Sequence, residues 1–247
     1  MSNELLNKAI IFATKCHAGQ VRKGTSRAYI THPLETMSIL NFMQADESLL
    51  AAGVLHDTIE DTDATYEQLI DLFGYDIAEL VGKHSEDKSK SWKERKSNAI
   101  KELKEAPLRV KLLVMADKVA NLRSMYVDYQ IVGEKLWERF NAPKKLQAWY
   151  YSGIQDALVD LQHIPEAKEV YWEMVGRFKD LFVDYYIDVK NDILYQICAD
   201  DTGCMLKKET CEWTPIDEEI GKVVRLERYR AEFIEDMWNE MIERDYN

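Results

Sequence analysis

The stretch LHDTIEDT at residues 55–62 places one histidine and three carboxylates directly behind an apolar run. A core helix has no need of so many polar groups. Adjacent side chains such as His56 and Asp57 cannot point the same way inside a helix, but they can at a helix end, where the backbone turns. The stretch is therefore either a solvated helix end or a site that holds a metal ion and a water molecule for chemistry.

Two residues elsewhere in the chain could supply further metal ligands. His32 stands in YITHPLE, and Asp117 stands in the apolar context LLVMADKVANL, where a lone ionised carboxylate is costly to desolvate and needs a partner. Asn121, four residues later, shares the face of Asp117 and could hold a ligand or a substrate oxygen. Mixed imidazole and carboxylate ligation with open positions favours Mn, Fe or Zn over Ca or Mg.

Each of these residues by itself is more often a satisfied core histidine or an exposed acid than a metal ligand. The occurrence of all four candidate ligands together favours a metal site instead. Glu60 and Asp61, which follow His56 by about one helical turn, strengthen this interpretation. Glu60 can share a face with the ligands at the i+4 spacing without binding the metal. The pair therefore suits activation of a water molecule.

The elements that must position these residues are helical, because apolar residues recur at helical spacing between only ten glycines and five prolines. Residues 48–57 are apolar on nearly every side and predict a buried helix. Residues 65–74 predict a helix capped near Thr65 and stopped by Gly74. A long helix is expected after Pro107, which suits a first turn. The fold class is predicted to be all-α.

The last third of the chain is predicted to be a helical extension. Residues 166–197 carry an aromatic-rich stripe at helical spacing, and the Asp-Asp-Thr-Gly signal at 200–203 predicts a loop or short hairpin within 198–213. Thr214, Pro215 and Asp217 resemble a helix start, followed by a terminal helix to about Asp245. The four cysteines show no C-x-x-C pair and are expected to be reduced thiols.

Charge is distributed unevenly along the 247 residues, whose net charge is −12. Residues 165–247 contain 11 basic and 21 acidic side chains, whereas residues 83–104 contain eight basic and four acidic ones, a net +4. The acidic total argues against a general nucleic-acid binder. The basic segment is either a solvated helix face or an anion site. The start of the chain lacks a signal-peptide pattern and no stretch approaches the ~20 apolar residues of a membrane span, so a cytoplasmic protein without membrane contact is expected.

The motifs HAGQVRKG, AYITHP, LHDTIEDT, FG and MADKVANLR together resemble the HD-domain hydrolases of the RelA/SpoT type, especially the short stand-alone alarmone hydrolases. The resemblance covers roughly residues 5–160, in the family's order. It implies an HD-domain helical bundle. The resemblance also implies that one metal ion, usually manganese, is held by His32, His56, Asp57 and Asp117, and that Glu60 and Asp61 position and activate the attacking water. It implies nucleotide contacts from Arg22, Lys23 and Asn121. By the same resemblance, His17 is a motif histidine that is not a ligand.

The sequence departs from this family at Ala28, where proline is usual, and in residues 83–96, where the basic segment replaces a simpler stretch. Cations must hold a highly charged substrate, so Lys88 in that segment is a further candidate contact beside Arg22 and Lys23. Residues 1–164 are expected to form the HD phosphohydrolase domain. Residues 165–247 are expected to form an acidic helical extension of unknown role.

The function that follows is metal-dependent hydrolysis of (p)ppGpp at the ribose 3′ position, with manganese as cofactor and a phosphorylated guanine nucleotide as substrate. Two alternatives stay open. The same ligands would serve a phosphatase or pyrophosphohydrolase of another nucleotide such as NADPH. A non-catalytic nucleotide sensor or partner-binding protein is also possible, although intact Glu60 and Asp61 argue against a pure binder. The sequence does not reveal the oligomeric state.

Overall fold

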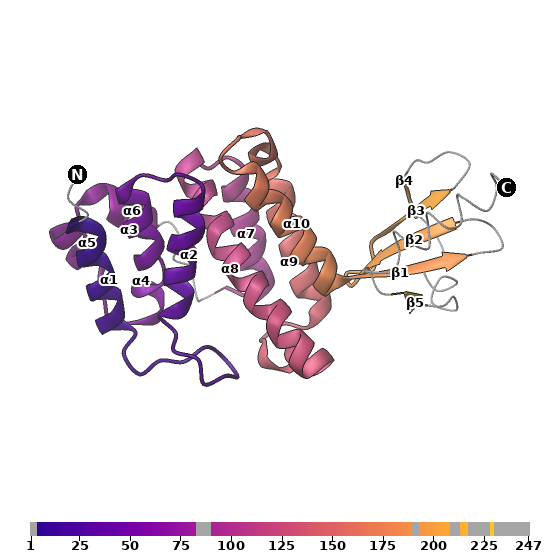
Figure 1. Ribbon diagram of the computed structural model, residues 1–247, viewed down its shortest axis with the longest axis horizontal. Helices are drawn as coiled ribbons and strands as arrows, with labels where there is room; N and C mark the ends of the chain where they lie inside the picture. Colours follow the sequence, from indigo (N-terminus) through magenta and orange to yellow (C-terminus); the bar gives the residue numbers. More distant parts are fainter. Residues whose placement is uncertain (1–3, 83–89, 189–192, 208–212, 217–227, 230–247) are drawn as a thin grey trace. The chain divides into compact units, whose positions relative to one another are not determined.

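The computed structural model describes residues 4–82, 90–188, 193–207, 213–216 and 228–229 (Figure 1). Its contacts divide the chain into two compact units, which we describe separately. The first consists of Met1–Asn141 with Gly153–Arg177, and the second of Ala142–Ser152 with Phe178–Asn247. The sequence predicted a domain boundary after residue 164. The units of the structure are divided differently, because the first part of the helix Lys168–Phe182 belongs to the first unit.

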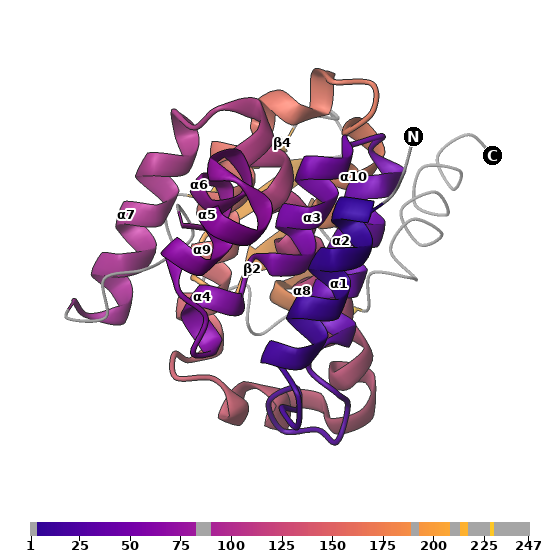
Figure 2. The same cartoon turned by 90° about the vertical axis from the view of Figure 1, so that its left-hand side faces the viewer.

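The first unit is a bundle of helices around one short helix, α3, whose residues from Leu49 to Leu55 are all apolar. Its elements are α1 (Glu4–Cys16), α2 (Thr31–Phe42), α3 (Glu47–Leu55), α4 (Thr58–Asp61), α5 (Tyr66–Phe73), α6 (Tyr75–Gly82), α7 (Trp92–Lys104), α8 (Leu108–Val132), the 3₁₀ helices η1 (Gly133–Arg139) and η2 (Val159–His163), and parts of α9 (Lys144–Ala157) and α10 (Lys168–Phe182). Helix α3 contacts α1, α2, α6 and α8, and Figure 2 shows it enclosed among them. All residues from Leu49 to Leu55 are buried, which confirms the predicted core helix.

Local sequence signals set several helix ends as predicted. The Thr65 side chain caps α5 in a capping box with Gln68, and Gly74 ends the helix at a φ of 87°. Pro107 is the residue before α8. Helix α3 ends at Leu55, so His56 and Asp57 lie in the turn before α4. The predicted helix end, which lets these two side chains converge, is therefore present.

The second unit corrects the predicted C-terminal helices. A five-stranded antiparallel sheet in the order β4-β3-β2-β1-β5 is built from β1 (Val183–Asp188), β2 (Ile193–Cys198), β3 (Gly203–Lys207), β4 (Trp213–Pro215) and β5 (Arg228–Tyr229). The prediction of helix over 166–197 is right only as far as Phe182. Beyond Phe182 the spacing of the apolar residues is compatible with a helix or a strand. The strand forms because β1 pairs with β2, in cross-strand pairs such as Tyr186 with Tyr195.

The expected hairpin at 198–213 is confirmed in the pairing of β2 with β3, with Asp201 at a φ of 72° in the turn. The helix start expected at Thr214 and Pro215 is wrong, because both residues belong to β4. The predicted terminal helix to Asp245 lies outside the described residues except for β5. Cys16, Cys198 and Cys204 are free thiols as expected, and Cys211 lies outside the described residues.

The described part of the chain is thus predominantly helical, with the strands confined to the second unit apart from an isolated bridge between Val21 and Ala28. Within the described ranges, no helix combines the length and the apolar character that a bilayer crossing requires.

Candidate metal centre

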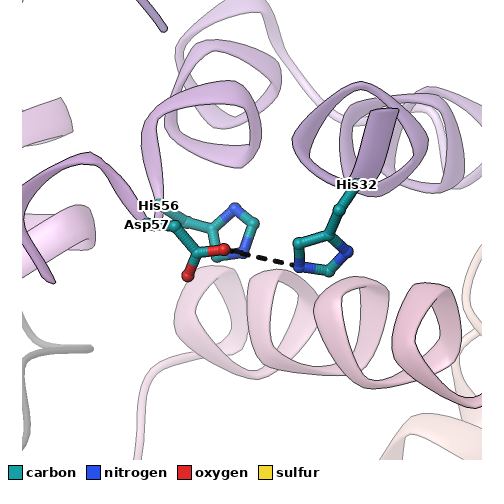
Figure 3. Close-up of side chains that lie close together, drawn as sticks. All are labelled: His32, His56 and Asp57. Atoms are coloured by element: carbon teal, nitrogen blue, oxygen red, sulfur yellow. Dashed lines mark ion pairs between the residues drawn. The ribbon is translucent and has the colours of Figure 1, made fainter. Parts of the chain in front are cut away.

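Four side chains from three helical segments converge on one point inside the first unit. The Nε2 atom of His56 lies 3.0 Å from Oδ2 of Asp57, and the Nε2 atom of His32 lies 3.5 Å from the same oxygen. Figure 3 shows the two imidazole rings turned toward each other with the Asp57 carboxylate beside them. Oδ1 of Asp117 lies 3.2 Å from His32 Nε2 and 3.7 Å from His56 Nε2. The structure therefore brings together all four side chains predicted as ligands.

The helices that carry these residues also fix their orientation. The Nδ1 atom of His56 lies 2.8 Å from the carbonyl oxygen of Gly53, one turn earlier in α3. We assign the proton of a neutral His56 ring to Nδ1, because a carbonyl oxygen can only accept a hydrogen bond. Nε2 then presents its lone pair toward the Asp57 and Asp117 carboxylates. A backbone contact of this kind is a common way of orienting a metal-binding histidine.

Asp117 is a buried carboxylate in the middle of α8, and its charge is compensated on both sides. Lys118 Nζ lies 2.6 Å from Oδ2 of Asp117, and the Asn121 side-chain amide donates to Oδ1 at 2.7 Å. Burial by itself would raise the pKa of Asp117, but Lys118 and the two imidazoles outweigh it and hold that pKa well below its usual value. Asp117 is therefore ionised, as a metal ligand must be.

The pKa values of Asp57 and His56 are set by the same balance of burial and neighbouring charge. Burial opposes ionisation of Asp57, but the His56 and His32 imidazoles lower its pKa below the usual range. Burial opposes protonation of His56, but Asp57 and Asp117 raise its pKa well above the usual value. A proton on His56 thus neutralises the carboxylates where a cation would otherwise do so.

This donor set fits a divalent transition metal. His32, His56 and Asp57 offer ligand atoms that all lie within 4.8 Å of one another, and Asp117 Oδ1 adds a fourth. Two imidazole nitrogens with two carboxylate oxygens suit Mn, Fe or Zn. They suit Ca or Mg less well, because these ions prefer ligand sets made of oxygen alone. The two carboxylates supply the negative charge and the two buried imidazoles supply the nitrogen ligands that such an ion needs.

The acidic pair Glu60 and Asp61, beyond the candidate ligands, lies in the short helix α4. Glu60 is half-buried and Asp61 is exposed. Asp61 is linked to the cluster by Tyr29, whose hydroxyl lies 2.9 Å from Asp61 Oδ2 and 2.7 Å from Asp57 Oδ2. Sequence reasoning missed Tyr29. Its position three residues before His32 is the one local signal that could have identified it.

A second layer supports Tyr29 from the N-terminal side. The buried His17 ring stacks on Tyr29 with centroids 4.8 Å apart, and His17 Nδ1 lies 2.7 Å from Gln20 Oε1. The Gln20 amide in turn donates to the Asp61 carbonyl oxygen at 2.8 Å. His17 is therefore joined to the cluster through Tyr29.

The residues predicted to bind substrate are partly assembled here. Arg22 donates to Asn121 Oδ1 at 2.7 Å, so a chain of hydrogen bonds runs from Arg22 through Asn121 to Asp117. Lys23 is exposed and donates to Asn141 at 3.3 Å. Lys88 lies outside the described residues. The neighbouring part of the basic segment forms α7, which begins with a capping box between Ser91 and Glu94.

A pocket of about 140 Å³ adjoins the metal centre. His32 and Glu35 of α2 line it together with Arg22 and Arg27 of the loop before α2 and with Arg123 and Ser124 of α8. The Arg123 guanidinium is paired with Glu173 at 2.6 Å. Sequence reasoning missed Arg27 and Arg123, because neither stands in a motif that separates a pocket arginine from an ordinary surface one.

Comparison with known proteins gives concordant matches over this part of the chain. The pattern of the HD domain family matches residues 9–139. The GTP pyrophosphokinase of Myxococcus xanthus is 37% identical over 131 residues, which are 49% of this chain and 17% of that protein. The guanosine-3′,5′-bis(diphosphate) 3′-pyrophosphohydrolase MESH1 of Drosophila melanogaster is 38% identical over 120 residues, which are 47% of this chain and 67% of that protein.

Among solved structures, a metazoan ortholog of SpoT that hydrolyzes ppGpp matches with a TM-score of 0.59 and 27% identity, covering 72% of this chain and 96% of that chain. This chain spans less than a fifth of the length of the Myxococcus relative. The similarity therefore concerns the helical unit that contains the metal centre.

Proposed function

We propose that this chain, which belongs to the HD domain family, is a metal-dependent hydrolase that removes pyrophosphate from the ribose 3′ position of (p)ppGpp and leaves GDP or GTP. The observation that carries the proposal is the convergence of two imidazole nitrogens and two carboxylates beside a pocket lined by arginine. In the reaction, water adds to phosphorus, the bond from phosphorus to the ribose oxygen breaks, and the ribose oxygen takes a proton.

We assign the metal to His32, His56, Asp57 and Asp117, with Mn²⁺ as the ion. A divalent ion bound there would lower the pKa of water and neutralise charge on a phosphoryl oxygen. The buried position of Asp117 and the backbone contact of His56 hold the ligand atoms in place before the ion arrives. This preorganisation supports the assignment.

In this proposal Glu60 and Asp61 orient the attacking water and take its proton. Both follow the ligand pair His56–Asp57 within one helical turn, and Asp61 shares the Tyr29 hydroxyl with Asp57. A carboxylate in such a position can accept a proton from water as it attacks. The fixed contact through Tyr29 supports Asp61 as the orienting group and leaves Glu60 as the candidate base.

Arg22, Lys23, Asn121 and Lys88 are proposed to hold the nucleotide and its phosphates. Arg22 donates a hydrogen bond to Asn121, and Asn121 in turn donates one to the proposed ligand Asp117. Charge-assisted hydrogen bonds from a guanidinium suit phosphate oxygens. Lys88 rests on the net charge of its segment alone. The names of the Drosophila relative and of the metazoan neighbour support a ppGpp substrate.

Product analysis tests the proposal. Purified protein loaded with Mn²⁺ is incubated with ppGpp, pppGpp, NADPH and simple nucleotides, and the products are separated. Release of pyrophosphate from the first two alone is the expected result. Phosphate release from NADPH would favour the other enzyme, and binding of (p)ppGpp without turnover would favour a nucleotide sensor. A cytoplasmic location and a separate role for residues 165–247 stay predictions from the sequence.

A further inference from the structure

The loop between α1 and α2 is folded into a small hairpin that carries Arg22. An isolated β-bridge joins Val21 to Ala28, and the Arg22 amide donates to the Arg27 carbonyl oxygen at 2.8 Å. The Tyr29 amide donates to the Gln20 carbonyl oxygen at 2.9 Å, which closes the base of the hairpin. Because backbone hydrogen bonds join the two arms of the hairpin, a contact that holds Arg27 in place also holds Arg22 on the opposite arm.

One carboxylate on α8 anchors this hairpin. Arg27 Nη2 lies 2.6 Å from Oδ1 of Asp128, and Arg139 Nη1 lies 2.9 Å from Oδ2 of the same side chain. Arg27 also donates to Ser124 at 3.4 Å. The Asp128 side chain is only 13% exposed, so its two ion pairs are shielded from solvent more than ordinary surface pairs.

A second contact shows that the hairpin sits closely against η1, the element that carries Arg139. Gly24 has a φ of 73°, and a Cβ atom at this position would lie 2.5 Å from Cδ of Arg139. Arg139 is therefore packed under the hairpin tip at the same time as it binds Asp128. The Arg27–Asp128–Arg139 triad thus joins the loop, α8 and η1.

We propose that Asp128 is a positioning residue: through Arg27 it holds the hairpin so that Arg22 stays beside Asn121 and the pocket next to the metal centre. Arg22 and Arg27 both line that pocket. Asp128 also neutralises Arg27, so that the hairpin is held toward α8. Without this carboxylate, Arg27 and Arg139 would repel each other across the gap and the hairpin would lose its charged anchor. The kinetic part of this inference rests on the proposed hydrolase function, whereas the structural part does not.

The test replaces Asp128 with Asn and reads the hairpin directly. Whichever way the new amide faces, its NH₂ group opposes one of the two guanidinium groups, so one ion-pair contact becomes a contact between donors. Hydrogen–deuterium exchange of peptides that cover residues 20–29 should accelerate, while exchange of α2 and α3 should stay unchanged. An unchanged rate for the hairpin overturns the inference, with or without any enzymatic activity.

Steady-state kinetics provide the second measurement. With Mn²⁺-loaded protein and ppGpp, Asp128→Asn should raise KM about tenfold while kcat and metal content stay within about twofold, because one charge-assisted contact that positions a binding group is lost. Arg27→Gln should show the same split, and the double variant should be no worse than either single one if Asp128 acts through Arg27. If the increases in KM of the two single variants add up in the double variant, Asp128 does not act through Arg27 and the inference fails.

An ion pair outside the pocket provides a control on the same unit. Asp76 also accepts a short ion pair, from Arg109 at 2.8 Å, but it lies in α6 and outside the pocket lining. Asp76→Asn should change neither hairpin exchange nor KM. If it raises KM as much as Asp128→Asn does, the effect is a general loss of stability and the inference fails. A wild-type protein that does not hydrolyse (p)ppGpp would refute the proposed function and leave the exchange test intact.

Discussion

The hydroxyl of Tyr29 lies 2.7 Å from Oδ2 of Asp57, the oxygen that faces both histidines of the metal centre. The same hydroxyl lies 2.9 Å from Asp61. Burial, together with these two carboxylates, raises the pKa of Tyr29 above its usual value, so the phenol keeps its proton and acts only as a donor to them. Tyr29 therefore connects a proposed metal ligand with Asp61, the carboxylate proposed to orient the attacking water.

Replacing Tyr29 with Phe should leave metal binding nearly intact and lower turnover. The ring and its stacking on His17 are retained, but Asp61 loses the hydroxyl that fixes its direction. A hydrogen bond to a charged group contributes ~1.5–3 kcal/mol, so kcat should fall roughly ten- to a hundredfold. Initial rates with ppGpp and elemental analysis for manganese measure the two effects. Tyr75→Phe, whose side chain is 62% exposed, is the control and should change neither quantity.

Removing one imidazole should abolish metal loading without unfolding the helices. His56→Ala deletes a proposed ligand whose Nε2 lies 3.0 Å from Asp57, and it leaves the Asp57 and Asp117 carboxylates with one histidine fewer. Manganese content after loading and gel filtration should drop to background, and turnover should be lost with it, while the far-ultraviolet circular dichroism spectrum stays helical. His163→Ala, at an exposed position in η2, is the control. A His56→Ala protein with full metal content would remove His56 from the ligand set.

The parts of this site that were predictable from the sequence depend on short-range rules. The turn after Leu55 follows from the polar residues that interrupt a buried helix, and the burial of Asp117 follows from its apolar neighbours in α8. Asn121 lies four residues from Asp117, and their hydrogen bond is the i, i+4 contact expected on a helix. Each of these inferences needs only the geometry of one element.

The parts that were missed depend on how distant segments meet. Tyr29 contacts Asp57 across 28 residues, and Arg27 contacts Asp128 across 101. No local pattern specifies either pair. The strands β1 and β2 were predicted to continue a helix because aromatic and aliphatic residues at 183–197 suit both periods. Their pairing is a non-local contact, and it prevailed over local helical propensity.

Helix packing behind the metal centre gives a prediction about stability. Gly53 lies in α3, and a Cβ atom there would lie 2.5 Å from Cδ1 of the fully buried Leu40 in α2. In Gly53→Ala this overpacking should lower the free energy of unfolding by ~1–3 kcal/mol. The greater helix propensity of alanine should offset ~0.5–1 kcal/mol of that loss. Urea unfolding measures this difference. Gly176→Ala is the matched control, since a Cβ atom there would meet no other described part of the chain within 4 Å, and it should keep or raise stability. Equal stability of the two variants would contradict the close packing of α2 on α3.

The half-buried Glu60 separates catalysis from binding. It lies in α4, four residues beyond His56, and is not among the four converging side chains that we propose as ligands. Glu60→Gln keeps the size and hydrogen-bonding capacity of the side chain but removes the charge that accepts a proton. If Glu60 is the general base, kcat should fall by ~10²- to 10⁴-fold, the usual contribution of such a group.

Manganese content and affinity for the nucleotide should change little in the same variant, because neither depends on proton transfer. Affinity is measured with the Glu60→Gln protein and ppGpp by calorimetry, under conditions where turnover is negligible. Asp61→Asn is the informative companion: as an orienting group held by Tyr29, Asp61 should give a smaller loss than Glu60. Undiminished turnover in Glu60→Gln, or a larger loss in Asp61→Asn, would transfer the role of base from Glu60 to Asp61.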